Sequence, residues 1–520
     1  MPNGVYAKNK CDKDRTNIFI PTEHQTETMN YFLDSKYRGL LLYHRLGSGK
    51  TCTSYMISDK MLELGMINHV YVFSPGSLRQ NWFSEYCQVC GKNKEFFENN
   101  YTFVTYNYAS RNIPSLENSL VIIDEVHNLI NGVKNESKTQ VNMYDKIYYS
   151  TCRILALSGT PVINNIHEFS FLGTLLKGKT FFEGDKESFK EECKNGKMKT
   201  RLEGIISYYP GKEDSFMPEI IYKPPIKTLM TIKQQLSWSY DMGLEHKFLH
   251  PPDERIRNSK KYDFQRQMMI MAKKRILSRK SSNFYFLETR YEDADGNEIN
   301  IDDGTVKTVD DIKDGSYFRE NGGLYNYSPK YCALFINIVL HLHQKQALFT
   351  FYKEKAGVNF IKRMLNSCGI TAEIFSGDLT DVKRQKLLEK FNCVENRNGE
   401  LIKILLITEA GAEGISLLET RHFHIVESST SPTKILQAIG RLARYKSHAK
   451  LPEEDRNVTI WRYWSTCKNG LISKKGRLEP DNDMNKCTGI DEQLYLEGEE
   501  KLKEYNLFLD ILKEVSVTTY

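Results

Sequence analysis

The chain has 520 residues, of which 40% are hydrophobic and 27% charged, and this is the composition of a globular protein with room for two or three domains. Its longest apolar stretches, such as residues 331–342, are about half the roughly twenty residues that a membrane-spanning helix needs, so a membrane protein is excluded. A net charge of +6 is compatible with nucleic-acid binding but does not require it.

The cysteines and the N-terminal residues indicate an intracellular protein in a reducing compartment. The 11 cysteines form no paired framework, and residues 1–30 are polar and charged rather than signal-like. Cys87 and Cys90 have the spacing of half a zinc site, but no second pair completes four ligands. We therefore expect no zinc and interpret Cys90 as part of a helix end.

The first predicted helix follows Pro21 and runs to Leu33. Thr22 and Gln25 have the spacing of a capping box, in which each side chain accepts a hydrogen bond from the backbone of the other residue. By this pattern alone, Gln25 belongs to the start of a helix.

A phosphate-binding loop is predicted at residues 43–51, Tyr-His-Arg-Leu-Gly-Ser-Gly-Lys-Thr. This stretch departs from G-x-x-x-x-G-K-[ST] only at His44, which stands where the motif has its first glycine. A buried-strand pattern precedes it at 40–43 and a helical pattern follows to residue 64. Phosphate-binding loops need this context, because the helix N-terminus and the loop N–H groups hold the anion. An ordinary Gly-Ser-Gly turn is the alternative. The predicted ATP-binding residues here are Gly47, Ser48, Gly49, Lys50 and Thr51.

Two turns after the next strands are candidates for contact with a nucleic-acid backbone. The strand at 70–73 is followed by a turn that contains Pro75, Gly76 and Arg79, and the strand at 102–105 ends in Thr105 and Tyr106. Backbone N–H groups, an arginine, a hydroxyl and an aromatic ring are suitable for such contacts. Ordinary strand-to-helix loops are the alternative.

A pair of acidic residues at the end of a strand supplies the second half of an ATPase site. The apolar run 120–123 leads into Asp124, Glu125, Val126 and His127, 74 residues after Lys50. In an open α/β sheet the carboxyl ends of strands surround the ligand. We therefore expect Asp124 and Thr51 to hold Mg²⁺ and Glu125 to activate the attacking water.

Four motifs together resemble superfamily 2 helicases. Gly-Ser-Gly-Lys-Thr at 47–51, Asp-Glu-Val-His at 124–127, Ser-Gly-Thr-Pro at 158–161 and Gln-Ala-Ile-Gly-Arg-Leu-Ala-Arg at 437–444 occur in the order of motifs I, II, III and VI. Residues 158–171 are similar to the Snf2-like branch. His44 and residues 440–448 resemble the helicase-like ATPases of poxviruses and other large DNA viruses, which include nucleoside triphosphatase I and the early transcription factor small subunit.

This resemblance implies roles for individual residues. It implies that Gln25 reads adenine, which leaves two interpretations of this residue open. It implies that Arg441 and Arg444, three apart on a predicted helix, stabilise the γ-phosphate in the transition state. It also implies that turns at 75–79 and 103–106, with Thr408 beyond them, contact nucleic acid. The residues implied to couple the nucleotide to the nucleic acid are His127, Ser158, Thr160 and Gln437.

The predicted fold is α/β, with two RecA-like lobes that each contain a doubly wound parallel sheet. Strands at 40–43, 70–73, 102–105, 120–123 and 153–157 alternate with helices in the first lobe, residues 1–204. Strands at 346–351, 371–375, 402–407, 422–426 and 458–463 form the second lobe, residues 328–520, which ends in a predicted amphipathic helix.

Residues 205–327 are predicted to form a partly helical insertion between the lobes. Ten basic residues and one acid occur at 255–280, whereas 291–320 contains ten acids and three basic residues. A basic helical arm that touches phosphates and a solvated helix that pairs with the acidic segment are both compatible with this pattern.

The predicted function is an ATP-dependent nucleic-acid helicase or translocase that uses ATP and Mg²⁺. The resemblance implies a role in viral transcription, with DNA or RNA and with RNA polymerase or other transcription factors as partners, in the virion and the host cytoplasm. The alternative is a nucleic-acid-stimulated ATPase that acts as an initiation or termination factor without unwinding. An assembly protein with a relic ATPase is disfavoured by the intact Lys50, Asp124 and Glu125, and a P-loop ATPase without nucleic acid by the turns described above.

Overall fold

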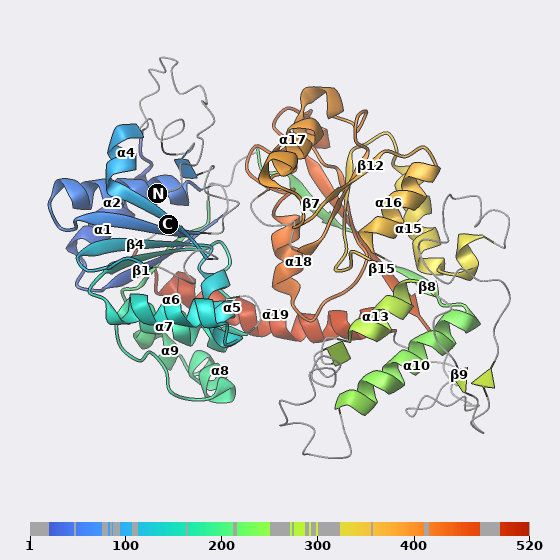
Figure 1. The fold of residues 1–520 in the computed structure, drawn as a ribbon, viewed down its shortest axis with the longest axis horizontal. Coiled ribbons are helices and arrows are strands. Elements are labelled where there is room, and N and C mark those ends of the chain that lie inside the picture. The colour runs from blue at the N-terminus through green and yellow to red at the C-terminus, as the bar shows by residue number, and fades with distance from the viewer. Residues whose placement is uncertain are drawn as a thin grey trace. The chain divides into compact units, whose positions relative to one another are not determined.

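The computed structural model divides the chain into two compact units, which Figure 1 shows. Unit 1 comprises residues 1–213 and 501–520, and unit 2 comprises residues 214–500. Unit 1 thus includes residues 205–213 and 501–520 in addition to the predicted first lobe. Most of the predicted insertion belongs to unit 2. The division into three domains at 204/205 and 327/328 stays a prediction. The structure describes residues 20–45, 48–74, 82–83, 86, 94–106, 113–162, 165–211, 216–249, 271–272, 275–285, 291–292, 298–299, 323–354, 357–409, 415–467 and 489–518.

Unit 1 contains a six-stranded sheet in which every pairing is parallel. The strand order is β3-β2-β4-β5-β1-β6. The five strands that we predicted in the first lobe are confirmed, and β6 is an additional edge strand. Their bounds are β1 (Gly39–His44), β2 (His69–Ser74), β3 (Tyr101–Thr105), β4 (Ser119–Asp124), β5 (Arg153–Leu157) and β6 (Ile206–Tyr209).

Helices connect these strands, as the alternating pattern predicts. The helices before and between these strands that lie within the described residues are α1 (Glu23–Asp34), α2 (Lys50–Glu63), α4 (Lys94–Asn100), α5 (His127–Lys134), α6 (Lys138–Tyr149), α7 (Phe169–Lys177), α8 (Lys186–Lys194) and α9 (Lys197–Leu202), with a 3-10 turn at Ile166–Glu168.

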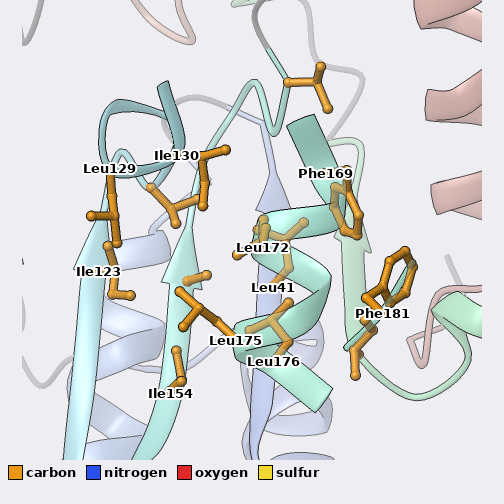
Figure 2. Close-up of a cluster of buried hydrophobic side chains, with 14 of the residues drawn as sticks. Leu41, Ile123, Leu129, Ile130, Ile154, Phe169, Leu172, Leu175, Leu176 and Phe181 are labelled. Carbon is orange, nitrogen blue, oxygen red and sulfur yellow. The ribbon is translucent and has the colours of Figure 1, made fainter. Parts of the chain in front are cut away.

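The sheet of unit 1 has apolar residues on both faces because both faces are covered. Along β1, Leu41 faces one hydrophobic core, while Leu40 and Leu42 face a second. In the first core, side chains of α7 such as Leu172 and Leu175 lie against the strands, as Figure 2 shows. Strands buried on both sides read as continuous apolar runs, which is why these strands could be predicted from sequence.

The last described residues form hydrogen bonds along the outer edge of β6. Val517 N donates to Ile206 O at 2.9 Å, Tyr208 N donates to Ser516 Oγ at 2.9 Å, and Thr518 Oγ1 donates to Tyr208 O at 3.1 Å. Unpaired edges are prone to pair with other chains, so this segment protects the edge of the sheet.

Unit 2 contains a second parallel sheet, in the order β12-β13-β11-β14-β15-β7, with β8 also paired to β15. The five strands predicted for the second lobe are confirmed, and the α/β class is confirmed for both units. The strands are β7 (Glu219–Tyr222), β8 (Ile226–Leu229), β11 (Gln346–Phe349), β12 (Ala372–Phe375), β13 (Ile404–Ile407), β14 (His422–Ile425) and β15 (Asn457–Thr466), and β9 (Tyr291–Glu292) pairs with β10 (Glu298–Ile299) as a separate small ladder.

The helices of unit 2 lie between and after these strands. They are α10 (Ile232–Leu249), α13 (Ile276–Asn283), α15 (Pro329–Leu340), α16 (Val358–Ser367), α17 (Asp381–Asn392) and α18 (Pro432–Ile439), with 3-10 turns at Leu324–Asn326, Val394–Asn396 and Glu453–Asp455. The predicted C-terminal helix is α19 (Ile490–Glu514), whose residues up to 500 cluster with unit 2 and whose later residues cluster with unit 1.

Residues of the middle segment pack into unit 2. Strands β7 and β8 pair with the two halves of β15, and Glu245 of α10 accepts hydrogen bonds from the first backbone N–H groups of α13. Arg279, in the basic stretch, is buried and its Nη2 donates to Ser428 O at 2.9 Å. This arginine therefore belongs to the interior of unit 2, whereas most of 255–280 lies outside the described residues.

Cysteine pairing differs from the expectation of reduced cysteines. Cys52 in unit 1 and Cys467 in unit 2 each take part in a disulfide of their own, while Cys152, Cys193, Cys332, Cys368 and Cys393 are free. Spacing along the sequence does not show which cysteines approach each other in the folded chain. Cys87 and Cys90 lie outside the described residues.

Among the described residues, no helix is long and apolar enough to cross a bilayer.

Candidate nucleotide site at the carboxyl edge of the first sheet

The loop between β1 and α2 ends at a glycine that no other residue could replace without strain. Gly49 has φ +79°, and a Cβ atom there would lie 2.7 Å from Gln25 Nε2. Helix α2 begins at Lys50, so its first N–H groups point out of the end of the helix toward the loop. Ser48 and Thr51 lie on either side of this junction, and Gly47 lies outside the described residues. This geometry fits a phosphate group.

Lys50 points back into the loop. Its Nζ donates to His44 O at 2.8 Å and to Arg45 O at 3.2 Å. The charge of Lys50 also acts on Asp124, where it partly offsets the rise in the pKa of the carboxyl that burial causes. The lysine of the loop and the acid after β4 are therefore brought into one electrostatic environment, although they are far apart in sequence.

Asp124 is held by three hydrogen bonds. Its Oδ2 accepts from Trp82 Nε1 at 2.7 Å and from Ser74 Oγ at 3.3 Å, and its Oδ1 accepts from Glu125 N at 3.0 Å. Burial, together with the neighbouring charge of Glu125, raises the pKa of Asp124 to about 7. A carboxylate in this position and the hydroxyl of Thr51 are oxygen ligands of the kind that Mg²⁺ prefers, so the residues fit the metal.

Glu125 begins a chain of polar contacts that leads to the turn after β5. The residue has φ +47°, a left-handed conformation that is uncommon outside glycine and clusters at functional sites. Its Oε2 lies 3.5 Å from His127 Nδ1, which is 3.2 Å from Ser158 Oγ. Thr160 N donates to the same Ser158 Oγ at 3.0 Å. Three of the four predicted coupling residues thus form a continuous chain, and the fourth, Gln437, lies in α18 of unit 2.

Gln25 forms the capping box that its spacing predicts and also contacts the loop. Its Oε1 accepts from Thr22 N at 3.0 Å, and its Nε2 donates to Gly49 O at 3.3 Å. The adjacent His24 lies with Nε2 3.2 Å from Ser48 O and stacks on Tyr209, with ring centroids 3.6 Å apart. Gln25 therefore lies at the loop, and its contact with adenine stays a prediction.

His44 is fully buried beneath the loop. Its Nε2 lies 2.8 Å from Ser207 Oγ, which in turn lies 3.1 Å from Thr28 Oγ1 and 3.3 Å from Thr518 Oγ1. Burial, with the charge of Lys50 as a second cause, keeps the pKa of His44 well below its usual value, so the ring is neutral. The side chain that replaces the first glycine of the motif thus faces the interior.

The predicted nucleic-acid contacts are only partly described. Pro75, Gly76 and Arg79 lie outside the described residues. Thr105 ends β3, and the hydroxyl of Tyr106 donates to Asp124 O at 2.8 Å. Thr408 follows β13 in unit 2 and is buried. The nucleic-acid contacts stay predictions.

The two arginines lie in unit 2, and their predicted helical placement is wrong. Helix α18 ends at Ile439; Arg441 lies in the turn at residues 440–442, and Arg444 lies in an irregular stretch beyond it. Arg441 is buried, whereas Arg444 donates from Nη1 to Ser416 Oγ at 2.6 Å and from Nε to Gly440 O at 3.1 Å. Their spacing therefore does not define a helix face.

Sequence reasoning missed several residues that build this site. Trp82, Ser207 and Tyr209 contact the acid, the buried histidine and His24 respectively. None of these residues belongs to a short motif, because each contact joins positions that are 42 or more residues apart.

Comparisons with known proteins agree with this geometry. Residues 18–163 match the family described as Type III restriction enzyme, res subunit, and residues 330–446 match the Helicase conserved C-terminal domain. The chain is 26% identical to nucleoside triphosphatase I of Heliothis armigera entomopoxvirus, over 96% of this chain and 80% of that protein. It is 24% identical to the termination factor NPH-I homolog of African swine fever virus, over 92% of this chain and 76% of that protein. It is 23% identical to a protein named as an ATP-dependent RNA helicase in Acanthamoeba polyphaga mimivirus, over 89% of this chain and 85% of that protein.

The order of the motifs, the two parallel α/β sheets and the matched families identify one protein class. The chain belongs to the superfamily 2 helicases of large DNA viruses and is an ATP-hydrolysing enzyme.

Proposed function

We propose that this enzyme couples ATP hydrolysis to movement along DNA or RNA during viral transcription. The observation that carries the proposal is the continuous polar chain from Glu125 through His127 to Ser158 and Thr160. Glu125, which we propose to act at the γ-phosphate, is thereby connected to the turn at residues 158–161, outside the nucleotide loop. Such a connection is what a motor needs in order to convert hydrolysis into motion.

Each residue at the carboxyl edge of the first sheet then has a chemical role. Lys50 binds the β- and γ-phosphates, and Thr51 with Asp124 holds Mg²⁺, which when bound neutralises phosphate charge. Glu125 orients the attacking water and accepts its proton. Arg441 and Arg444 stabilise the charge on the γ-phosphate in the transition state, and Gln25 contacts adenine.

The second part of the proposal concerns the nucleic acid. The turns at 75–79 and 103–106, with Thr408, bind its backbone, and Gln437 takes part in coupling. RNA polymerase or other transcription factors are the protein partners, and the enzyme acts in the virion and the host cytoplasm. Relatives from an entomopoxvirus, a mimivirus and African swine fever virus support a viral setting.

A second candidate is a nucleic-acid-stimulated ATPase that acts in transcription initiation or termination without separating strands. The observation that favours it is the relative of African swine fever virus, which is named a termination factor. Both candidates require ATP hydrolysis, but only the helicase displaces a strand.

The test is an ATPase assay of the full chain with single-stranded and duplex DNA and RNA, followed by strand displacement on the best stimulator. Lys50→Ala should abolish hydrolysis, whereas Lys60→Ala, an exposed position of the same helix, should not. Stimulation without displacement would favour the second candidate. Hydrolysis that no nucleic acid changes would overturn the motor proposal.

A further inference from the structure

Trp82 places an indole N–H against the acid that we assign to magnesium. The side chain is 2% exposed, and its Nε1 lies 2.7 Å from Asp124 Oδ2. This hydrogen bond is shorter than those that the same carboxylate accepts from Ser74 and from the backbone of Glu125. An indole can only donate a hydrogen bond and does not ionise, so its own charge stays the same while it holds the carboxyl oxygen.

The Trp82 ring is fixed by the helix that follows the phosphate-binding loop. Tyr55 of α2 packs edge-on against it, with ring centroids 5.3 Å apart, and the Tyr55 hydroxyl donates to Trp82 O at 2.6 Å. Phe103 of β3 packs against the ring from another element, at 6.2 Å. Side chains from α2 and β3 thus set the position of the indole before any ligand binds.

The two oxygens of Asp124 have different partners. Oδ1 accepts from the backbone N–H of Glu125, while Oδ2 accepts from Trp82 and more weakly from Ser74. A carboxylate held at both oxygens has a fixed plane, so its remaining lone pairs point in a defined direction. Groups that hold a metal ligand in this way commonly change metal affinity by 10- to 100-fold when they are removed.

We propose that Trp82 is a positioning residue for the metal contact of Asp124. The proposal rests on the proposed role of Asp124 as a magnesium ligand. Trp82 does not touch the reacting atoms; its N–H orients the carboxylate that holds the metal.

The test measures metal binding apart from hydrolysis. Mn²⁺ serves as the probe, and its free concentration is followed by electron paramagnetic resonance in the presence of the full chain and a non-hydrolysable ATP analogue. Trp82→Phe, which keeps an aromatic ring and removes the N–H, should weaken Mn²⁺ binding about tenfold. Phe83→Leu, which changes the residue next to Trp82 but leaves the indole and its contacts with Tyr55 in place, should bind Mn²⁺ with wild-type affinity.

A second variant separates the hydrogen bond from the volume of the ring. Benzothienylalanine, incorporated at position 82, keeps the bicyclic shape and replaces the N–H with sulfur, so it should reproduce the loss of affinity. Wild-type Mn²⁺ affinity in this variant would overturn the proposal, even if Trp82→Phe fails to fold.

Asp124→Asn distinguishes this proposal from the assignment on which it rests. If Asp124→Asn binds Mn²⁺ as the wild type does, Asp124 is not the metal ligand, and a different residue must hold the metal in the proposed function. If Asp124→Asn loses Mn²⁺ but neither change at Trp82 does, the metal site stands and the positioning role of Trp82 is wrong.

Discussion

Both sheets carry an acidic residue just beyond the carboxyl end of a central strand, but the two acids have different surroundings. In unit 1, beside the loop that holds Lys50, Glu125 is partly exposed, and Asp124 at the end of β4 keeps part of its surface exposed although its carboxyl is largely desolvated. In unit 2, Glu427 follows β14 and is 1% exposed. Acids near the carboxyl ends of central strands therefore occur in two kinds of surroundings in this chain.

The acid in unit 2 is part of a closed network. Glu427 accepts hydrogen bonds from Asn283 Nδ2, from Thr350 Oγ1 at 2.7 Å and from Phe351 N at 3.1 Å. Asn283 also accepts from Lys330 Nζ at 2.8 Å, and Lys330 pairs with Asp491 at 2.9 Å. The network joins α13, α15 and α19 to the strand ends of β11 and β14.

The comparison of Asp124 and Glu125 with Glu427 shows that a position near the end of a central strand does not by itself make an acidic residue catalytic. Buried groups with complete sets of partners stabilise one conformation and have no surface left for a ligand. Partly exposed acids beside a lysine remain available to a metal or a water. Substitutions at both edges test this contrast, and their expected effects range from a large loss of turnover to a small loss of stability.

Glu125→Gln should lower the turnover number for ATP by about 10²- to 10⁴-fold, because the amide cannot accept the proton of water. ATP binding and thermal stability should stay close to wild type, since the residue is partly exposed. Steady-state hydrolysis and a fluorescent-nucleotide titration measure the two effects. Glu63→Gln, at an exposed position of the same unit, is the control, and equal losses in both variants would contradict the assignment.

Lys330→Ala should lower the free energy of unfolding by about 3–5 kcal/mol, because Asp491 would stay buried without its cation. Urea denaturation followed by circular dichroism measures this loss. Lys362→Ala, which removes a half-exposed pair with Glu373 in the same unit, should cost no more than about 1 kcal/mol. Similar costs for the two lysines would show that the network is not buried as described.

Asp124→Asn should change how stability depends on pH. The pKa of Asp124 is raised from 3.8 to about 7 in the folded chain, so the wild type loses stability as pH rises through this window. The amide does not titrate. Without metal or nucleotide, the variant should therefore melt at a higher temperature than the wild type above pH 7, and the difference should shrink toward pH 4. A difference that is constant with pH would refute a raised pKa.

Ser207→Ala should have the smallest effect, about 1 kcal/mol of stability, because it removes one buried hydrogen-bond partner of His44. Nucleic-acid stimulation of hydrolysis should stay within about twofold of wild type, as expected if His44 has a structural role. Ser119→Ala, which removes a different buried hydroxyl of the sheet, is the control. Lost stimulation in Ser207→Ala alone would indicate that His44 senses the nucleotide.

Sequence patterns predicted the parts of the fold that are buried on both sides. The central strands are continuous apolar runs such as residues 120–123, and they appear in the structure where they were expected. The edge strands β6, β7 and β8 were missed. Strands β7 and β8 are short and partly exposed and form only because β15 offers a partner, so their sequences carry little signal of their own.

By itself, the sequence determined the chemical inventory of the site and its order along the chain. Lys50, Asp124 and Glu125 could be named because strand ends and the loop motif are local patterns. Only the tertiary structure decided which polar side chains surround them. Trp82 meets Asp124 and Ser207 meets His44 across 42 and 163 positions, and no local pattern encodes such contacts. The tertiary structure also decided that Glu427 is buried in a closed network, because burial depends on the packing of elements that are distant in sequence.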